Sequence, residues 1–80
     1  MRVDVLLFAS LKDALGPRVA VDVAANATLS ELRRALETAH PEIARIGSRA
    51  RFALNEVWAR EEDGVRAGDV VALLPPIAGG

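Results

Sequence analysis

The stretch Val70-Val-Ala-Leu-Leu-Pro-Pro76 decides the fold. Its first five residues are a continuous apolar run, which predicts a buried central strand over 70–74. Pro75 and Pro76 have no amide hydrogen and hold φ near about −65°, so they end strand pairing. We therefore expect the chain to leave its sheet abruptly, and from the middle of the sheet rather than from an edge.

The N-terminal segment Arg2–Phe8 predicts a second central strand. Val3, Val5 and Leu7 share one face, and the opposite face becomes apolar only towards Phe8. Three further short segments have strand patterns and are separated by turn residues: Arg18–Val23, Arg51–Leu54 and Glu56–Ala59.

The best-specified element is an amphipathic helix over Thr28–Ala39. Thr28 and Glu31 have the spacing of a capping box, in which each side chain binds the backbone amide of the other residue. Leu32 and Leu36 repeat at helical spacing after it, while Arg33, Arg34 and Glu37 are expected on the polar side. Shorter helical turns are expected at Ala9–Leu15 and Pro41–Ile46.

This order of elements predicts an α+β domain of the β-grasp, ubiquitin-like class. A hairpin, a helix that crosses the sheet and a last strand in its middle make up a mixed sheet of about five strands. The right-handed crossover rule lets the first and last strands lie parallel and adjacent. We expect residues 1–74 to form this domain and residues 75–80 to form a flexible, extended C-terminal tail.

Composition excludes several functions. The 80 residues carry a net charge of −1 and no cysteine, so nothing indicates nucleic-acid binding, a thiolate metal site or a catalytic thiol. No metal-ligand spacing, phosphate-binding loop or nucleophile–base pair is present either. No segment approaches the roughly 18 apolar residues that span a bilayer. We expect a cytoplasmic protein that binds no cofactor, metal, nucleic acid or membrane.

The tail Pro75–Gly80 is the candidate reactive feature. At about 3.1–3.3 Å per residue it reaches roughly 19 Å beyond the domain. Ile77 and Ala78 offer apolar side chains to a partner. Gly79 and Gly80 have no Cβ and can enter a channel too narrow for other residues. The sequence ends there, which predicts a free carboxylate at Gly80 that becomes reactive once it is activated.

The tail and the Ala67-Gly-Asp-Val-Val-Ala72 stretch before it resemble the small subunit of molybdopterin synthase, the MoaD family. The shared signature is Gly-Asp, an apolar strand, Pro-Pro, two variable residues and a final Gly-Gly. The resemblance implies a ubiquitin-like sulfur carrier. An E1-like adenylyltransferase would use ATP to adenylate Gly80, and a sulfur donor protein would then convert it to a thiocarboxylate.

The same resemblance implies the partners. The tail (Pro75, Pro76, Ile77, Ala78 and Gly79, with Gly80 carrying the sulfur) would insert into the large synthase subunit within a heterotetramer. There the sulfur passes to cyclic pyranopterin monophosphate to form the molybdopterin dithiolene. The catalytic pocket is expected on the large subunit, so whether this chain counts as an enzyme is left open.

The family also implies an apolar docking patch at Phe8, Trp58 and Leu74. Ordinary core positions are the alternative, equally weighted for Phe8 and Leu74, whereas an interface is favoured for Trp58. For the basic stretch that includes Arg51, a solvated face is favoured over contact with an acidic partner.

Three other functions stay open. The first is a sulfur carrier for thiamine or tRNA thiolation, although thiamine-type carriers usually lack the Pro-Pro segment. The second is a ubiquitin-like protein modifier, and the third is an interaction module with an inert tail.

Overall fold

The computed structural model describes residues 1–76, so the predicted tail residues Ile77, Ala78, Gly79 and Gly80 lie outside the described residues. Eight elements follow the predicted order: β1 Arg2–Leu7, α1 Ala9–Leu15, β2 Arg18–Asp22, α2 Leu29–Ala39, α3 Pro41–Ile46, β3 Arg51–Leu54, β4 Val57–Trp58 and β5 Val71–Leu74.

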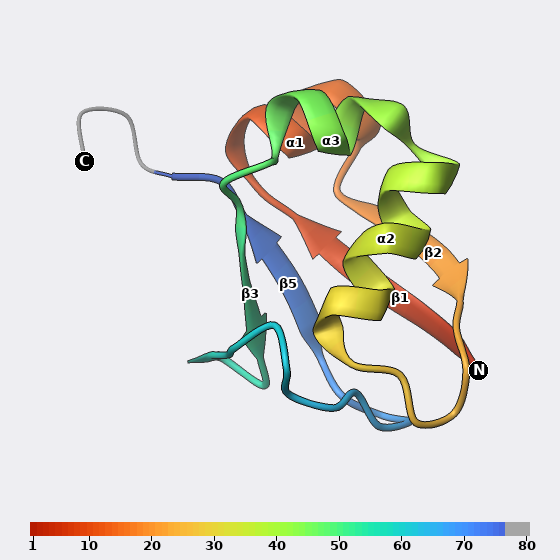
Figure 1. The fold of residues 1–80 in the computed structure, drawn as a ribbon. Helices are drawn as coiled ribbons and strands as arrows, with labels where there is room; N and C mark the ends of the chain where they lie inside the picture. The colour runs from red at the N-terminus through yellow and green to blue at the C-terminus, as the bar shows by residue number, and fades with distance from the viewer. Residues whose placement is uncertain (77–80) are drawn as a thin grey trace.

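The strands form one mixed sheet in the order β2-β1-β5-β3-β4 (Figure 1). β5 pairs in parallel with β1 and antiparallel with β3, which confirms that the last strand lies in the middle. The two outer pairs, β1–β2 and β3–β4, are antiparallel. The predicted β-grasp arrangement is therefore present, and the chain leaves the sheet at Pro75 from its central strand.

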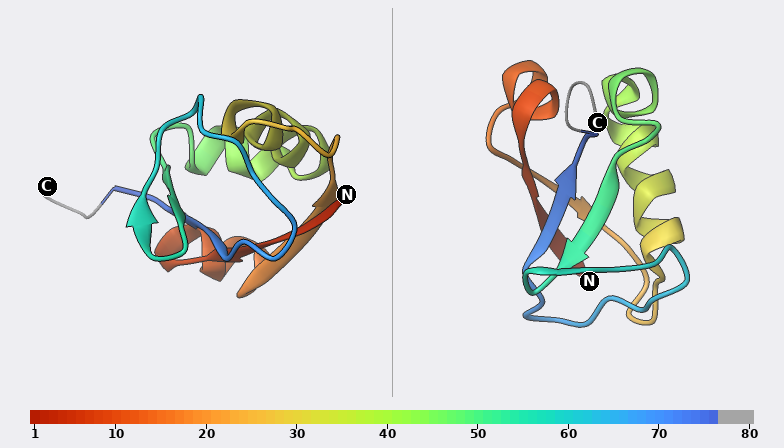
Figure 2. Two further views of the ribbon diagram at one scale, coloured as in Figure 1. Left: turned by 90° about the horizontal axis from the view of Figure 1, so that it is seen from below. Right: turned by 90° about the vertical axis from the view of Figure 1, so that its left-hand side faces the viewer.

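The helix α2 begins as the sequence predicts. The Thr28 side chain accepts from the Glu31 amide, and the Glu31 carboxylate accepts from the Thr28 amide at 2.9 Å. The helix then crosses one face of the sheet, and α2 and α3 lie together on that side (Figure 2). Leu29, Leu32 and Leu36 are fully buried there.

The core lies between α2 and the covered side of the sheet. The strands contribute alternate residues to it, including Val5, Leu7, Phe52 and Leu73, all of which are almost inaccessible. Leu11 of α1 and Ile43 of α3 close one end. No helix formed by residues 1–76 has the length and apolarity needed to cross a bilayer.

The interpretation of Val70–Leu74 as a buried strand is only half right. Val71 and Leu73 are buried, but Ala72 and Leu74 are half-buried and Val70 is 51% exposed. The reason is that helices α2 and α3 cover one face of β5, whereas a fully buried strand needs both faces covered.

Arg33, which the sequence places on the polar side of α2, is held by other parts of the fold, and its side chain is only 17% exposed. Its guanidinium donates to the carbonyl oxygens of Gly47 and Ala50 at 3.3 and 2.6 Å and to both carboxylate oxygens of Glu61 at 2.9 Å. It also lies 5.0 Å from the Phe52 ring centroid. Arg33 therefore joins α2 to the end of α3 and to the loop before β5.

Candidate partner-docking face and tail exit

The side of the sheet away from α2 carries an apolar strip. The strand register aligns Leu6, Ala72, Ala53 and Trp58 in one row that crosses four strands from β1 to β4. Phe8, Leu74 and Val70 flank this row, and we call these seven residues the open face. Phe8 and Trp58 are 43% and 55% exposed, although large apolar side chains are usually covered by the protein's own fold.

The open face is hollowed at its centre. One hollow of about 310 Å³ is lined by Phe8, Ala53, Glu56, Trp58, Ala72 and Leu74. An adjoining hollow of about 420 Å³ shares Phe8, Ala53, Glu56 and Ala72 with it. Two alanines at paired positions form the floor, and larger side chains form the walls. A hollow with this lining has room for an apolar side chain.

The β3–β4 turn determines where Trp58 lies. Leu54 and Val57 are paired, so only Asn55 and Glu56 form the loop, with φ of 52° and 70°. Positive φ at both central residues is the mark of a type I′ hairpin turn. Glutamate rarely adopts this region, so the surrounding contacts must hold it there.

Asn55 supplies those contacts. Its side-chain oxygen accepts from the Val70 amide at 2.9 Å, its amide nitrogen donates to Asp69 at 3.2 Å, and its backbone amide donates to the Val70 carbonyl at 2.8 Å. The second Asp69 oxygen accepts from the Arg66 amide at 2.9 Å. The Arg66 backbone hydrogen bond, followed by the Asn55 side chain, lowers the pKa of Asp69 below its ordinary value.

Arg51 lies against the outer wall of the hollow. Its guanidinium carbon is 4.6 Å from the Trp58 ring centroid, a cation–π distance. Arg51 pairs in register with Leu74, so it also borders the tail exit. The favoured view of Arg51 as part of a solvated face is therefore incomplete, because the side chain is exposed but supports the tryptophan.

The structure brings together the described residues that the sequence singled out. Phe8, Trp58 and Leu74 line one hollow, and Phe8 and Trp58 are too exposed to be ordinary core residues. Pro75, half-buried, and Pro76, exposed, follow directly where β5 ends. Because β1 and β5 are parallel, Phe8 and Pro75 lie at the same end of the sheet.

Sequence reasoning missed the floor of the site and its support. Nothing in the sequence marks Ala53 or Ala72 as a site residue, and only the strand register shows that they are paired. Asn55 lies between two segments predicted as strands, but nothing in the sequence identifies it as the link to Asp69 and Val70. Among residues 1–76, no group of acidic or histidine side chains is placed to hold a metal ion.

A family model and a known protein match the sequence of this chain. A model of the ThiS family matches residues 5–80. The molybdopterin synthase sulfur carrier subunit of Chlamydomonas reinhardtii is 30% identical over 83 residues, which cover the whole of both chains.

Solved structures also match the chain over its full length. The crystal structure of SAMP1 from Haloferax volcanii matches with a TM-score of 0.83 and 32% identity, covering 100% of both chains. A chain in the protein–protein complex of subunits 1 and 2 of molybdopterin-converting factor from Helicobacter pylori matches with a TM-score of 0.70 and 27% identity, again over 100% of both chains.

Proposed function

The chain belongs to the ThiS family, and from this we propose that it is the sulfur carrier subunit of a molybdopterin synthase. One observation carries the proposal. Phe8, Trp58 and Leu74 line a single apolar hollow at the end of the sheet where Pro75 begins the tail. A partner that occupies this hollow is positioned to receive the tail as well. The curated relative and the converting-factor complex support the choice of partner, the large synthase subunit.

The proposed chemistry takes place at Gly80. An E1-like adenylyltransferase joins the Gly80 carboxylate to the α-phosphate of ATP and releases pyrophosphate. A sulfur donor protein then delivers sulfur at the oxidation level of sulfide, which attacks the acyl carbon and displaces AMP, and a thiocarboxylate remains. In the large subunit this sulfur is transferred to cyclic pyranopterin monophosphate, and two such transfers form the dithiolene. ATP is consumed by the activating enzyme and is not bound by this chain.

The rest of the chain positions the tail, as a β-grasp domain of residues 1–74 that holds the tail 75–80. Strand pairing on both sides of β5 fixes the point from which the tail starts, and Pro75 and Pro76 direct it outward. Ile77 and Ala78 contact the partner, and Gly79 lets the backbone enter a narrow channel. We place the complex, a heterotetramer, in the cytoplasm.

Mass spectrometry of the intact protein tests the carrier chemistry. Incubation with ATP, a matching activating enzyme and a sulfur source is expected to add about 16 Da, the mass difference between sulfur and oxygen. The variant that lacks Gly80 is the control and is expected to gain nothing. A mass gain followed by conversion of the pterin precursor with the large subunit identifies molybdopterin synthesis. A gain without conversion favours thiamine or tRNA thiolation.

Adding one residue after Gly80 tests the terminal mechanism. The extension displaces the reacting carbon, so we expect sulfur transfer to be lost while thermal unfolding is unchanged. Activity of the extended protein without trimming would contradict the mechanism.

A ubiquitin-like protein modifier is the second candidate. It is favoured by the similarity to SAMP1, since a second Haloferax volcanii structure, of small archaeal modifier protein 1, also matches with 32% identity and a TM-score of 0.81. A modifier forms an amide between Gly80 and a lysine of a target. Conjugates of higher mass that appear with ATP and resist thiols would favour this function. Lys12 is the single lysine of the sequence, so Lys12→Arg shows whether any conjugate is a self-linked chain.

A further inference from the structure

The two edges of the sheet differ in how far they expose their backbone. The β4 edge consists of two residues, Val57 and Trp58, and short edge strands are a common protection against unwanted pairing. The β2 edge is five residues long, Arg18–Asp22, without an internal proline, and it pairs regularly with β1 over its whole length. The β2 edge is therefore the side of the sheet on which another strand fits.

The hydrogen-bond pattern shows which β2 groups are available. Met1 and Val23 exchange both backbone hydrogen bonds, at 2.8 and 2.7 Å. In an antiparallel ladder every second residue repeats this pattern, so Val21 and Val19 also bond to β1. The amides and carbonyls of Arg18, Ala20 and Asp22 therefore point away from β1. No strand in the described part of the chain pairs with them.

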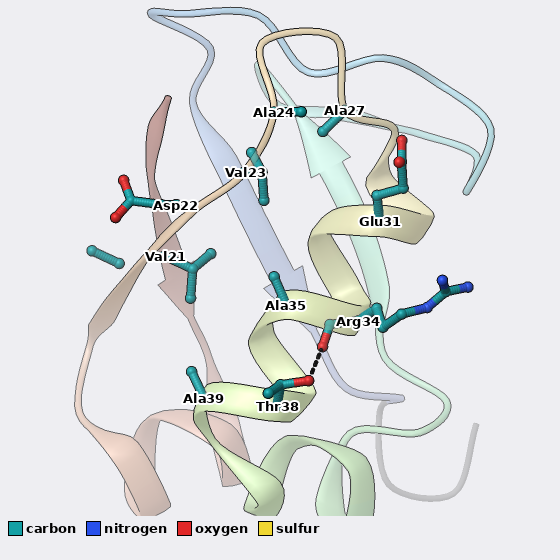
Figure 3. A pocket seen from close by; sticks show the side chains of 11 residues that line it. Val21, Asp22, Val23, Ala24, Ala27, Glu31, Arg34, Ala35, Thr38 and Ala39 are labelled. Atoms are coloured by element: carbon teal, nitrogen blue, oxygen red, sulfur yellow. Dashed lines mark hydrogen bonds between the residues drawn. The ribbon is translucent and has the colours of Figure 1, made fainter.

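A hollow of about 640 Å³ lies beside this edge, between β2 and α2 (Figure 3). Val21 and Val23 point into it from the strand side, and Ala35 and Ala39 from the helix. Glu31, Arg34 and Thr38 of α2 line the hollow as well, and the small side chains of Ala35 and Ala39 leave space between the helix and the edge strand. A strand added to β2 would place alternate side chains over this hollow.

We propose that the occupant is a second copy of this chain, joined by antiparallel pairing of the two β2 strands. Centring the pair on Ala20 places Arg18 of each copy directly opposite Asp22 of the other. Arg18, Ala20 and Asp22 all carry outward backbone groups, so the same register exchanges hydrogen bonds at each of these pairs. Val19 then faces Val21 of the other copy on the helix side. The sequence Arg-Val-Ala-Val-Asp is thus complementary to itself in charge and in hydrogen bonding.

The two charged side chains are available for this pairing. Arg18 and Asp22 are exposed, and within residues 1–76 neither forms an ion pair. Arg2 is the β1 neighbour of Asp22 in register, but its guanidinium pairs with Asp4 at 3.3 Å. Opposite charges directly across an antiparallel pair stabilise it, and like charges destabilise it. An extended segment of another protein would use the same backbone groups of β2. The positions of Arg18 and Asp22, however, favour a second copy of this chain over such a segment.

The dimer leaves the docking site free. The two-fold axis of an antiparallel edge pair runs perpendicular to the sheet, so both α2 helices lie on one side and both open faces on the other. Trp58 is on β4, at the opposite edge of the sheet from β2. Each copy therefore keeps its hollow and tail exit accessible.

Sedimentation equilibrium from micromolar to millimolar protein tests this proposal. The unaltered chain is expected to approach the dimer mass at the upper end of the range. Arg18→Asp and Asp22→Arg each create two like-charge pairs and are expected to raise the dimer dissociation constant by about tenfold. The double variant restores opposite charges and is expected to restore the dimer. An equimolar mixture of the two single variants is expected to form the mixed dimer.

Ala20→Pro provides a second, independent disruption. The Ala20 amide points outward, and proline is tolerated at such an edge position, so the monomer is expected to fold and its dimer to be lost. Circular dichroism checks the fold. A monomer at all concentrations would overturn the proposal. So would a dimer that is insensitive to these variants but lost on Trp58→Ala, because that dimer would form through the open face.

Discussion

The two faces of the sheet are built from the same strands but differ in how far the rest of the fold covers them. On the covered face, Phe52 and Leu73 are almost inaccessible beneath α2. On the open face, their neighbours along the chain include Ala53 and Leu74, which lie at the hollow with the exposed Trp58. Because side chains alternate along a strand, one short segment contributes to both faces at once.

The difference separates stability from recognition. Residues of the covered face lose their contact with water on folding, so they supply most of the hydrophobic stabilisation. Residues of the open face remain partly in water, so in the proposed complex their burial contributes to binding instead. Substitutions on the two faces should therefore change different measured quantities.

Leu73 and Leu74 give the largest contrast, because they are adjacent and face opposite sides. Leu73→Ala removes a fully buried side chain and is expected to lower the free energy of unfolding by about 2–5 kcal/mol. Leu74→Ala is expected to cost about 1 kcal/mol or less, since the site is only half-buried. Urea unfolding of both variants measures the difference. Equal losses in the free energy of unfolding would show that the two faces contribute equally to stability.

Trp58→Ala tests the open face directly. We expect affinity for the large synthase subunit to fall by about 2 kcal/mol, roughly 30-fold, because a wall of the hollow is lost. The loss of the Arg51 contact is expected to lower unfolding stability by only about 0.5–1 kcal/mol. Val57→Ala is the matched control, exposed on the same strand but outside the hollow. Titration calorimetry that gives equal affinities for the two variants would exclude the tryptophan from docking.

Asn55 tests how the site is supported. Asn55→Ala removes the side-chain bonds to Asp69 and to the Val70 amide and places alanine at positive φ, with an expected cost of about 1–2 kcal/mol in unfolding. Asn55→Gly loses the same bonds without the steric cost of positive φ. Asn55→Gly is therefore expected to lower the thermal unfolding temperature less than Asn55→Ala does. If the two variants unfold at the same temperature, the positive φ at position 55 does not contribute to the loss of stability.

Low pH should produce the smallest effect, through Asp69. Its pKa is lowered in the folded chain, so its contribution to stability is fully present above the unfolded pKa of about 3.9 and is lost as pH falls through the lower folded value. Asp69→Asn is the control. The stability difference between this variant and the unaltered chain should shrink as pH falls below about 4 in urea titrations. A constant difference would show that the Asp69 charge does not contribute.

The sequence predicts the fold well because its signals are local. The capping box at Thr28 and the alternation of Val3, Val5 and Leu7 fix the helix and the first strand, and both predictions are confirmed. The two prolines after Leu74 mark where β5 ends. Central strands and short connections then leave few possible topologies.

The site is less predictable because its shape depends on contacts between distant segments. The run Val70–Leu74 predicts burial on both faces. The sequence does not distinguish an apolar residue that packs against a helix from one that stays exposed on the open face. Ala53 and Ala72 become the floor of the hollow only through the β3–β5 register. Likewise, nothing near Glu56 in the sequence predicts that it adopts positive φ.

The position of β5 also has a consequence for synthesis of the protein. Without β5, the β1–β2 and β3–β4 hairpins share no strand pairing, so the sheet is continuous only after β5 inserts between them. Contacts between the first and last strands are slow to form because they are distant in sequence. Phe8, Trp58 and Leu74 therefore come together only in a chain whose β5 has been synthesised and has inserted, so the proposed docking site is absent from partly made copies.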